Sequence, residues 1–219
     1  MPLSTLKSAI SEQVELKTRD GVEIIGDYYA PYSTSARGLL LLHMMPATRS
    51  SWRTFAVKTQ AAGFNVLAID LRGHGESQGG PDGYKNFTDA EHQDSKFDVE
   101  AGAEFLKSKS VSRLYLGGAS IGANLSLNYL AEHPEVQGAF LLSPGIDYRG
   151  VKTESAAKSI KPDQAVYFAA SAEDMRSSGQ SAADMAETLY GLCACRKELK
   201  KFDNAGHGTT IFERESAFM

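Results

Sequence analysis

The chain has 219 residues, of which 42% are hydrophobic and 23% charged, as in a globular protein that buries a substantial core. Its formal net charge is −4 and its sequence pI is near 5.8, so it has no basic excess to attract nucleic acid or an anionic membrane surface. We expect a small molecule as its partner and no nucleic acid. The sequence leaves the oligomeric state open.

The N-terminal and cysteine patterns suggest a compartment. The sequence contains no run of 18 apolar residues, and its start, MPLSTLKSAISEQ, lacks the apolar segment of a secretory signal. We therefore expect a cytoplasmic protein without a membrane span. The two cysteines, Cys193 and Cys195, are separated by one residue, which would strain a disulfide between them. We expect two free thiols and, because no further ligands stand out nearby, no bound metal.

The first structural pattern in chain order is QVELKTRDGVEIIGDYYAP, residues 13–31. Two alternating runs of apolar and polar residues flank an Asp-Gly pair. Because Asp-Gly is a frequent two-residue turn between antiparallel strands, this pattern predicts a β-hairpin.

Short apolar runs follow, each bounded by glycine or polar residues, at 38–45, 64–71, 112–120, 138–144, 165–171 and, more weakly, 198–206. Such runs are typical of strands buried on both faces in a parallel sheet. Segments with helical spacing lie between them, at 50–63, 88–109, 122–134 and 181–193. We expect Ser50 or Ser51 to cap the first of these helices and Ser181 the last.

The alternation of strands and helices predicts an α/β fold with a mostly parallel, doubly wound central sheet and helices on both faces. No repeat, low-complexity tract or long linker interrupts the chain, so we expect one domain over residues 1–219. In such folds the functional groups lie at the carboxyl ends of the strands.

One serine lies where a predicted strand turns into a helix. Residues 118–122, Gly-Ala-Ser-Ile-Gly, fit the pattern G-x-S-x-G, and a strand before it with a helix after it is the context of a nucleophile elbow. The serine of such a turn takes strained dihedral angles, and large neighbouring side chains would collide with the strand and the helix. We expect Ser120 to be a nucleophile; the alternative is a serine that caps the helix.

A serine hydroxyl needs a base at neutral pH, and five histidines compete for that role. His207 lies on a glycine-flanked loop after the last predicted strand, from which it could return across the sheet toward the serine. His43 ends a strand and is explained by orienting the adjacent loop, and His74 lies in a loop. His92 falls on a charged helix face that we expect to be solvated, and His133 falls at the end of a helix.

The acid that orients the base is expected between the serine and the histidine in sequence. Asp174 follows one predicted strand within SAEDM, and Asp147 follows the strand before it within SPGIDYRG. Chain order permits either residue. The turn of small and polar residues around Asp174 favours it, whereas an ion pair with a neighbouring arginine would account for Asp147.

Together these segments resemble the α/β-hydrolase fold family over nearly the whole chain. The matching motifs are LLLLHMMPATRSSW before the first long helix, AIDLRGHGES after the next strand, the elbow GASIG, the acid turn SAEDM and the histidine loop AGHG. The likeness is to a compact serine esterase or dienelactone-hydrolase-like branch. Dienelactone hydrolases usually carry cysteine at the elbow, so Ser120 favours an esterase.

Carried onto this chain, the resemblance implies Ser120 as nucleophile, Asp174 as acid and His207 as base. It further implies an oxyanion hole made by the backbone N–H groups of Met45 and Ile121. The chain departs from the family pattern beside one of these donors, because Met44 stands where glycine is usual. A side chain there would narrow the pocket or shift the loop.

The resemblance and the residues predict a carboxylesterase-like serine hydrolase that needs no metal or organic cofactor. Only residues 151–163 separate the last two motif-bearing strands before the acid turn, so no cap domain is expected and the open site suits small acyl esters. An acyl-thioesterase or a small-peptide hydrolase would use the same residues. A non-catalytic ligand-binding protein on the same fold is the alternative of another class.

Overall fold

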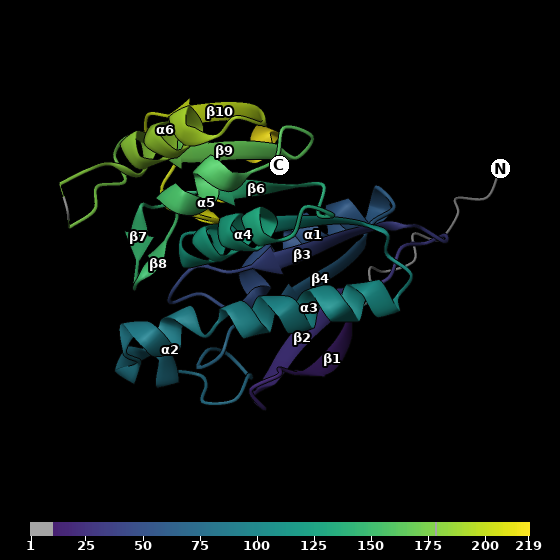
Figure 1. Cartoon of the computed structure of the whole chain (residues 1–219). Coiled ribbons are helices and arrows are strands. Elements are labelled where there is room, and N and C mark those ends of the chain that lie inside the picture. The colour runs from purple at the N-terminus through teal and green to yellow at the C-terminus, as the bar shows by residue number, and fades with distance from the viewer. Residues whose placement is uncertain (1–10, 178) are drawn as a thin grey trace.

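The computed structural model describes residues 11–177 and 179–219. In this part of the chain one eight-stranded sheet has the order β1-β2-β4-β3-β5-β6-β9-β10 (Figure 1). β2 runs antiparallel to both of its neighbours, and the remaining pairs are parallel. The strands are β1 (Glu12–Lys17), β2 (Glu23–Tyr29), β3 (Arg37–Leu42), β4 (Asn65–Ile69), β5 (Arg113–Ala119), β6 (Gly138–Leu142), β9 (Ala165–Ser171) and β10 (Arg196–Phe202).

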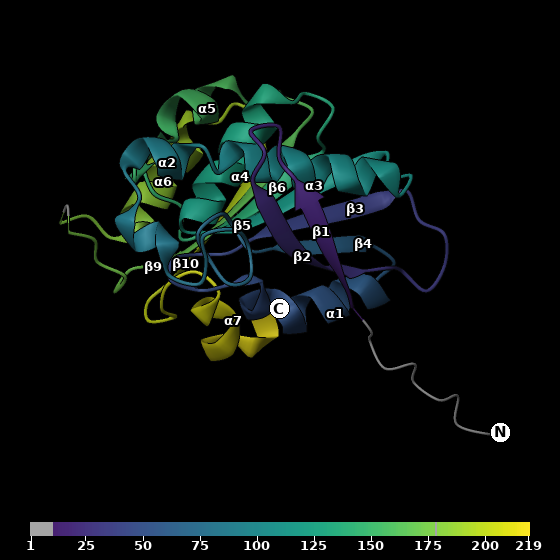
Figure 2. The same ribbon diagram turned by 90° about the horizontal axis from the view of Figure 1, so that it is seen from below.

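Helices cover both faces of this sheet, which confirms the predicted doubly wound architecture. Figure 2 shows α1 and α7 on one face, with the remaining helices on the other. No helix in the described ranges is long and apolar enough to cross a bilayer. The helices are α1 (Arg53–Ala61), α2 (Asp89–Gln93), α3 (Lys96–Ser108), α4 (Ile121–Glu132), α5 (Glu154–Ser159), α6 (Ala182–Leu192) and α7 (Thr210–Arg214).

The inner strands are apolar because both of their faces are covered. Every residue of β4 is buried, as are the five residues of β3 after its first. One hydrophobic cluster joins the sheet to α3, α4 and α6, and a second joins it to α1 and α7. Trp52 is fully buried in the second cluster, where its ring contacts those of Phe55, Phe140 and Phe212. Burial of this apolar surface is the main force that holds the helices on the sheet.

The sheet has a different character at its two edges. The predicted N-terminal hairpin is confirmed, with Lys17 opposite Glu23 and the connecting turn closed by a 2.9 Å hydrogen bond from Thr18 N–H to the Val22 carbonyl. At the other edge, β10 has the sequence RKELKKF and alternates exposed with half-buried residues. This alternation explains why β10 gave only a weak signal of a buried strand.

One of the two expected helix N-caps is absent. Ser50 and Ser51 do not cap α1, since they lie in a preceding 3₁₀ turn and α1 begins without a side-chain cap. Ser51 instead donates its hydroxyl to the Thr48 carbonyl within that turn, at 2.8 Å. The expectation for Ser181 is confirmed, because it forms a capping box with Asp184 at the start of α6.

The segment predicted as a single helix at 88–109 is instead two helices, α2 and α3. A capping box between Thr88 and Glu91 fixes the start of α2. α3 begins after Ser95 and buries Asp98, whose carboxylate accepts hydrogen bonds from the backbone and the guanidinium of Arg72 at 2.8 and 2.9 Å. The break lets α3 lie along the sheet with this ion pair buried beneath it.

No cap domain separates β6 from β9, as the sequence predicted. The connection contains a small hairpin of β7 (Asp147–Tyr148) and β8 (Val151–Lys152), followed by α5. Its two turn residues, Arg149 and Gly150, have φ angles of 55° and 79°, as a tight two-residue turn between antiparallel strands requires. The hairpin extends from the carboxyl end of the sheet (Figure 1).

Very close backbone packing sets the position of α4. A Cβ atom on Gly122 would lie 2.3 Å from the Leu42 carbonyl oxygen at the end of β3, and one on Gly118 would lie 2.2 Å from the Gly122 carbonyl oxygen. Only glycine permits these contacts. They explain the two glycines of the G-x-S-x-G pattern.

We predict that Gly122→Ala destabilises the protein by at least about 2 kcal/mol, because rigid backbone atoms must move to admit the methyl group. The matched control is Gly191→Ala in α6, where a new Cβ meets no atom within 4 Å and alanine is the better helix former. Urea denaturation of both variants measures the difference. Equal stabilities would contradict the packing argument.

Candidate active site

Ser120 lies at the turn between β5 and α4, at the carboxyl end of the sheet. Its φ and ψ angles are 54° and −119°, in a region that non-glycine residues rarely adopt. A 2.9 Å hydrogen bond from its N–H to the Leu142 carbonyl on β6 holds the strained backbone in place. The side chain is 8% exposed and lines a cavity of about 660 Å³. This is the geometry of a nucleophile elbow.

Asp174 and His207 come together beside the same cavity, although they lie 33 positions apart in the chain. Asp174 follows β9 and His207 follows β10, and these two strands are neighbours in the sheet. Asp174 Oδ2 lies 2.5 Å from His207 Nδ1. A carboxylate at this nitrogen keeps the proton there and leaves Nε2 free to accept one, as a general base requires.

Two glycines of the AGHG motif shape the histidine loop. Gly206 and Gly208 have φ angles of 80° and 57°, so both occupy left-handed backbone conformations. The N–H of Gly208 donates to Ser143 Oγ at 3.0 Å, which ties the loop to the end of β6. This hydrogen bond carries the histidine back across the sheet toward the serine.

Arg176 is the third group at the acid–base pair. Its guanidinium forms an ion pair with Asp174 Oδ1, and its Nη2 lies 3.0 Å from His207 Nδ1. Burial alone would raise the pKa of Asp174, but its hydrogen bonds and electrostatic interactions with His207 and Arg176 outweigh burial and lower that pKa. Asp174 is therefore a carboxylate throughout the neutral range.

The two residues predicted to supply oxyanion donors, Ile121 and Met45, lie after β5 and β3, which are neighbours in the sheet. Ile121 is the first residue of α4, so its N–H has no partner within the helix and lies at the positive end of the helix dipole. Met45 follows β3 and lines the cavity that contains Ser120. The arrangement suits a developing negative charge on a substrate oxygen.

His43 holds the loop that carries Met45. Its Nε2 accepts a hydrogen bond from the Leu71 N–H at 3.0 Å, so Nδ1 bears the proton and donates to the Met44 carbonyl at 2.9 Å. The ring is fully buried, with the His74 ring 4.8 Å away. Burial and the neighbouring His74 lower the pKa of His43 to about 4.

Met44, the departure from the family pattern, is not one of the residues that line the cavity around Ser120. A Cβ atom on Gly208 would lie 2.5 Å from Met44 Sδ, so the methionine side chain packs beneath the histidine loop. Met44 also contacts the second hydrophobic cluster. The additional side chain is accommodated by the glycine next to His207.

The structure separates the two candidate acids. Asp147 is exposed on β7, and its Oδ1 accepts a 2.8 Å hydrogen bond from the Gly150 N–H. It therefore closes its own hairpin turn, a role that differs from the expected arginine ion pair. Among the described residues, Asp174 is the carboxylate hydrogen-bonded to His207.

One other histidine differs from the sequence expectation in burial. His92 is 3% exposed and contacts the Phe87 ring, so the expectation of a solvated helix face is wrong. His74 is equally buried and stacks on Tyr84 at 4.1 Å between ring centroids. Neither residue lines the cavity around Ser120.

Two residues at the site were not predicted from the sequence. Arg176 follows the acid turn, and no local pattern marks it as a partner of the histidine. Tyr148 lines the cavity because it precedes the Arg-Gly turn of the hairpin. In the sequence, the Arg-Gly pair between these two short strands was the available signal of a tight turn.

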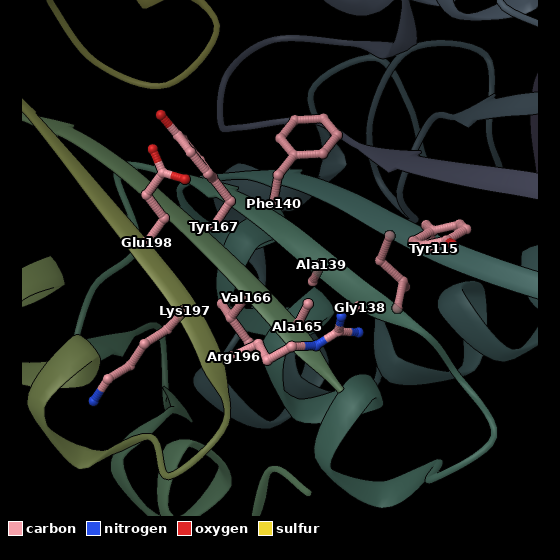
Figure 3. Close-up of a pocket in the computed structure, with 11 residues that line it drawn as sticks. Tyr115, Gly138, Ala139, Phe140, Ala165, Val166, Tyr167, Arg196, Lys197 and Glu198 are labelled. Atoms are coloured by element: carbon pink, nitrogen blue, oxygen red, sulfur yellow. The ribbon is translucent and has the colours of Figure 1, made fainter. Parts of the chain in front are cut away.

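A second cavity, of about 450 Å³, lies far from this chemistry. Its floor includes Gly138 and Ala165, the first residues of β6 and β9, so it opens at the amino end of the sheet. Figure 3 shows Phe140, Tyr167 and Glu198 projecting from one face of adjacent strands. Since Ser120 lies at the opposite end of the strands, this groove does not belong to the candidate active site.

The titratable groups in residues 11–177 and 179–219 form no cluster of three or more His, Cys, Asp or Glu side chains suited to a metal ion. Cys193 and Cys195 are both free thiols. Burial raises the pKa of Cys193 to about 12, so this thiol is a poor metal ligand and nucleophile at neutral pH.

We predict that the stability advantage of the wild type over His43→Gln shrinks by about 3 kcal/mol between pH 7.5 and pH 4. The folded-state pKa lies below the unfolded value of 6.5. As the pH falls through this interval, the unfolded wild type therefore takes up a proton that the folded state excludes. Glutamine does not titrate, so the variant lacks this loss. Urea denaturation at both pH values measures the difference, and a constant advantage would contradict the prediction.

A family model described as the alpha/beta hydrolase fold matches residues 39–182. A thermostable monoacylglycerol lipase from Bacillus sp. (strain H-257) is 32% identical over 111 residues, which are 50% of this chain and 41% of the lipase. The chain therefore matches less than half of that relative's length.

Solved structures show the same fold at lower identity. An esterase from Pyrococcus furiosus, Pf2001, has a TM-score of 0.78 at 21% identity, covering 100% of this chain and 93% of the esterase. An acetyl xylan esterase from Paenibacillus sp. R4 has a TM-score of 0.78 at 19% identity, covering 100% and 85%. A dienelactone hydrolase from Anabaena variabilis has a TM-score of 0.76 at 19% identity, covering 95% and 93%. With the family model matched over more than half of its length, the chain belongs to the α/β-hydrolase fold family.

Proposed function

We propose that this protein is a serine hydrolase that cleaves small acyl esters through an acyl-enzyme on Ser120. The observation that carries the proposal is the 2.5 Å contact between Asp174 and His207, beside the cavity that contains a serine with elbow geometry. In this proposal the nucleophile, base and acid follow three separate strands, β5, β10 and β9, of one parallel sheet. The names of the lipase and esterase relatives agree with ester hydrolysis.

In the first step Ser120 Oγ attacks the acyl carbonyl while its proton passes to His207 Nε2. Asp174 holds the ring in the required tautomer and stabilises the imidazolium that forms. The proton then moves to the leaving alcohol as the acyl–oxygen bond breaks. In the second step water attacks the acyl carbon while His207 Nε2 takes one of its protons. The acyl–Oγ bond then breaks, the proton moves from His207 to Ser120 Oγ, and the acid leaves.

The oxyanion of each tetrahedral intermediate accepts hydrogen bonds from the N–H groups of Ile121 and Met45. One such donor contributes about 3 kcal/mol in well-studied hydrolases. His43 acts through this loop as a positioning residue, since its hydrogen bond to the Met44 carbonyl fixes the peptide that precedes Met45. The proposed reaction uses proton transfers through His207 and hydrogen bonds from backbone N–H groups, and this chemistry needs no metal or organic cofactor.

The connection between β6 and β9 argues for small acyl groups. A two-stranded hairpin covers the site where a cap domain would otherwise enclose a long chain. Met45, Met175 and Met185 line the cavity, and Met175 is 58% exposed. A long acyl chain would remain partly in water and lose about 0.8 kcal/mol of burial energy for each exposed methylene.

The direct test is hydrolysis of p-nitrophenyl esters from acetyl to palmitoyl, together with a short-chain monoacylglycerol, by the wild type and by Ser120→Ala. We expect wild-type turnover on acyl chains of about two to six carbons, because longer chains gain no further burial. A fluorophosphonate probe should label the wild type and leave the variant unlabelled. Turnover by the variant should fall by several orders of magnitude.

Circular dichroism of Ser120→Ala provides the control, because the smaller side chain leaves the elbow backbone intact. A folded variant with near-normal turnover would refute the nucleophile assignment. Specificity constants that continue to rise up to palmitoyl would refute the small-acyl assignment while leaving the mechanism in place.

A pair of variants tests which carboxylate is the acid. Asp174→Asn should lower turnover by about 10³- to 10⁴-fold, because an amide favours the wrong tautomer of His207. Asp147→Asn is the matched control at an aspartate that lines the cavity, and its effect should be small because Asp147 closes a turn. Initial rates with one short-chain ester measure both. The opposite ranking in folded variants would move the acid to Asp147.

A further inference from the structure

The hairpin after β6 is rigidly attached to the helix that follows Ser120. Asn124 on α4 is fully buried and bridges both sides of this connection. Its Nδ2 donates to the Val151 carbonyl at 2.8 Å, and its Oδ1 accepts from the Gly145 N–H at 2.9 Å. The hydroxyl of Thr153 then donates to the Gly145 carbonyl at 2.7 Å. Residues of the hairpin therefore have fixed positions relative to the elbow.

Tyr148 is the hairpin residue that this attachment places against the nucleophile. Its ring packs directly on the backbone of Gly145, where a Cβ atom would lie 2.5 Å from the ring. Its hydroxyl interacts with the Ser120 side chain, with which it lines the same cavity, and it donates a long hydrogen bond of 3.4 Å to the Ser143 carbonyl oxygen. The hydrogen bond from the Tyr148 hydroxyl to the Ser143 carbonyl is long and therefore weak, so the phenolic proton remains available for a better acceptor.

The resting serine has no hydrogen bond to His207 within the described ranges of the chain. The side chain that interacts with its hydroxyl across the cavity is that of Tyr148. Burial raises the pKa of Tyr148 to about 12, although the charge of Arg176 opposes this effect. The phenol therefore keeps its proton over the working range of a serine hydrolase, and it is a permanent donor beside Oγ.

We propose that Tyr148 is a further catalytic residue, whose hydroxyl donates a hydrogen bond to Ser120 Oγ when that oxygen departs from the acyl-enzyme. This inference rests on the proposed serine hydrolase mechanism. In deacylation the bond between the acyl carbon and Oγ breaks, its electron pair stays on Oγ, and the proton on His207 Nε2 then moves to Oγ. Tyr148 keeps its own proton throughout and stabilises the transient negative charge.

The hydrogen bond from Tyr148 should accelerate deacylation more than acylation, because it strengthens more on the way to the deacylation transition state. Before acylation the Tyr148 hydroxyl already interacts with the serine hydroxyl, so attack gains little from this contact. In the acyl-enzyme Oγ is an ester oxygen, which is a poor acceptor, and it becomes a strong acceptor as it leaves. Only interactions that strengthen toward the transition state accelerate a step.

The test compares Tyr148→Phe with the wild type and with the matched control Tyr129→Phe. Tyr129 is a buried tyrosine on α4 whose ring stacks on His133, and it does not line the cavity around Ser120. For Tyr148→Phe we expect a 10- to 100-fold lower kcat on p-nitrophenyl butyrate, because one charge-stabilising donor is lost. We also expect a burst of p-nitrophenol and an acyl-enzyme visible by intact mass spectrometry. Tyr129→Phe should behave as the wild type.

The rate of fluorophosphonate labelling reports on the acylation half of the reaction and on the integrity of the site. In Tyr148→Phe it should stay within about threefold of the wild type, because Ser120 and His207 are unchanged. Unchanged kcat, or a lower kcat with neither burst nor acyl-enzyme, would overturn the role of Tyr148 alone. A wild type that neither hydrolyses the ester nor reacts with the probe would overturn the proposed function and this inference with it.

Discussion

The close contact between α4 and the strands beneath it is the constraint on which the site depends. At Gly118 and Gly122 the helix approaches the backbone of β3 and β5 more closely than any side chain would allow. This approach directs the first turn of α4 at the carboxyl end of the sheet and forces Ser120 into its left-handed conformation. Because local strain of this kind costs on the order of 1–3 kcal/mol, it persists only where the surroundings enforce it.

The charged groups at the site are positioned by the sheet and stabilised by one another. Asp174, Arg176 and His207 come from loops after the last two strands, and their mutual contacts replace the water that the carboxylate loses on burial. A buried carboxylate without such partners would take up a proton. The sheet supplies the spacing, while the ion pair and the hydrogen bond to the imidazole keep the acid ionised.

Most of the fold and part of the site could be predicted from the sequence, because those features depend on local patterns. Runs such as 38–45 and 64–71 identify buried strands, and the small residues around Ser120 identify the elbow. Contacts between distant segments could not be predicted in this way. The close approach of Tyr148 to the serine depends on Asn124 and on a hairpin turn, and nothing in the sequence near Tyr148 encodes a distance to α4.

Helix boundaries were difficult for a related reason. Ser51 has the character of a helix cap, yet its hydroxyl closes a turn that precedes the helix. The division of residues 88–109 into two helices is accompanied by a buried ion pair between Arg72 and Asp98 in the second helix, which a helical pattern alone does not reveal. In both places a specific polar contact is present that the local sequence does not predict.

The lysine-rich strand β10 has a consequence for how copies of this molecule meet. An outermost strand presents unpaired backbone groups to solvent and can add a strand from another molecule. β10 carries three lysines, Lys197, Lys200 and Lys201, and one glutamate. A second copy approaching in the same register would bring like charges together and would have to desolvate them. The positive edge therefore opposes the joining of two sheets into one continuous sheet, and salt, which screens such repulsion, weakens this protection.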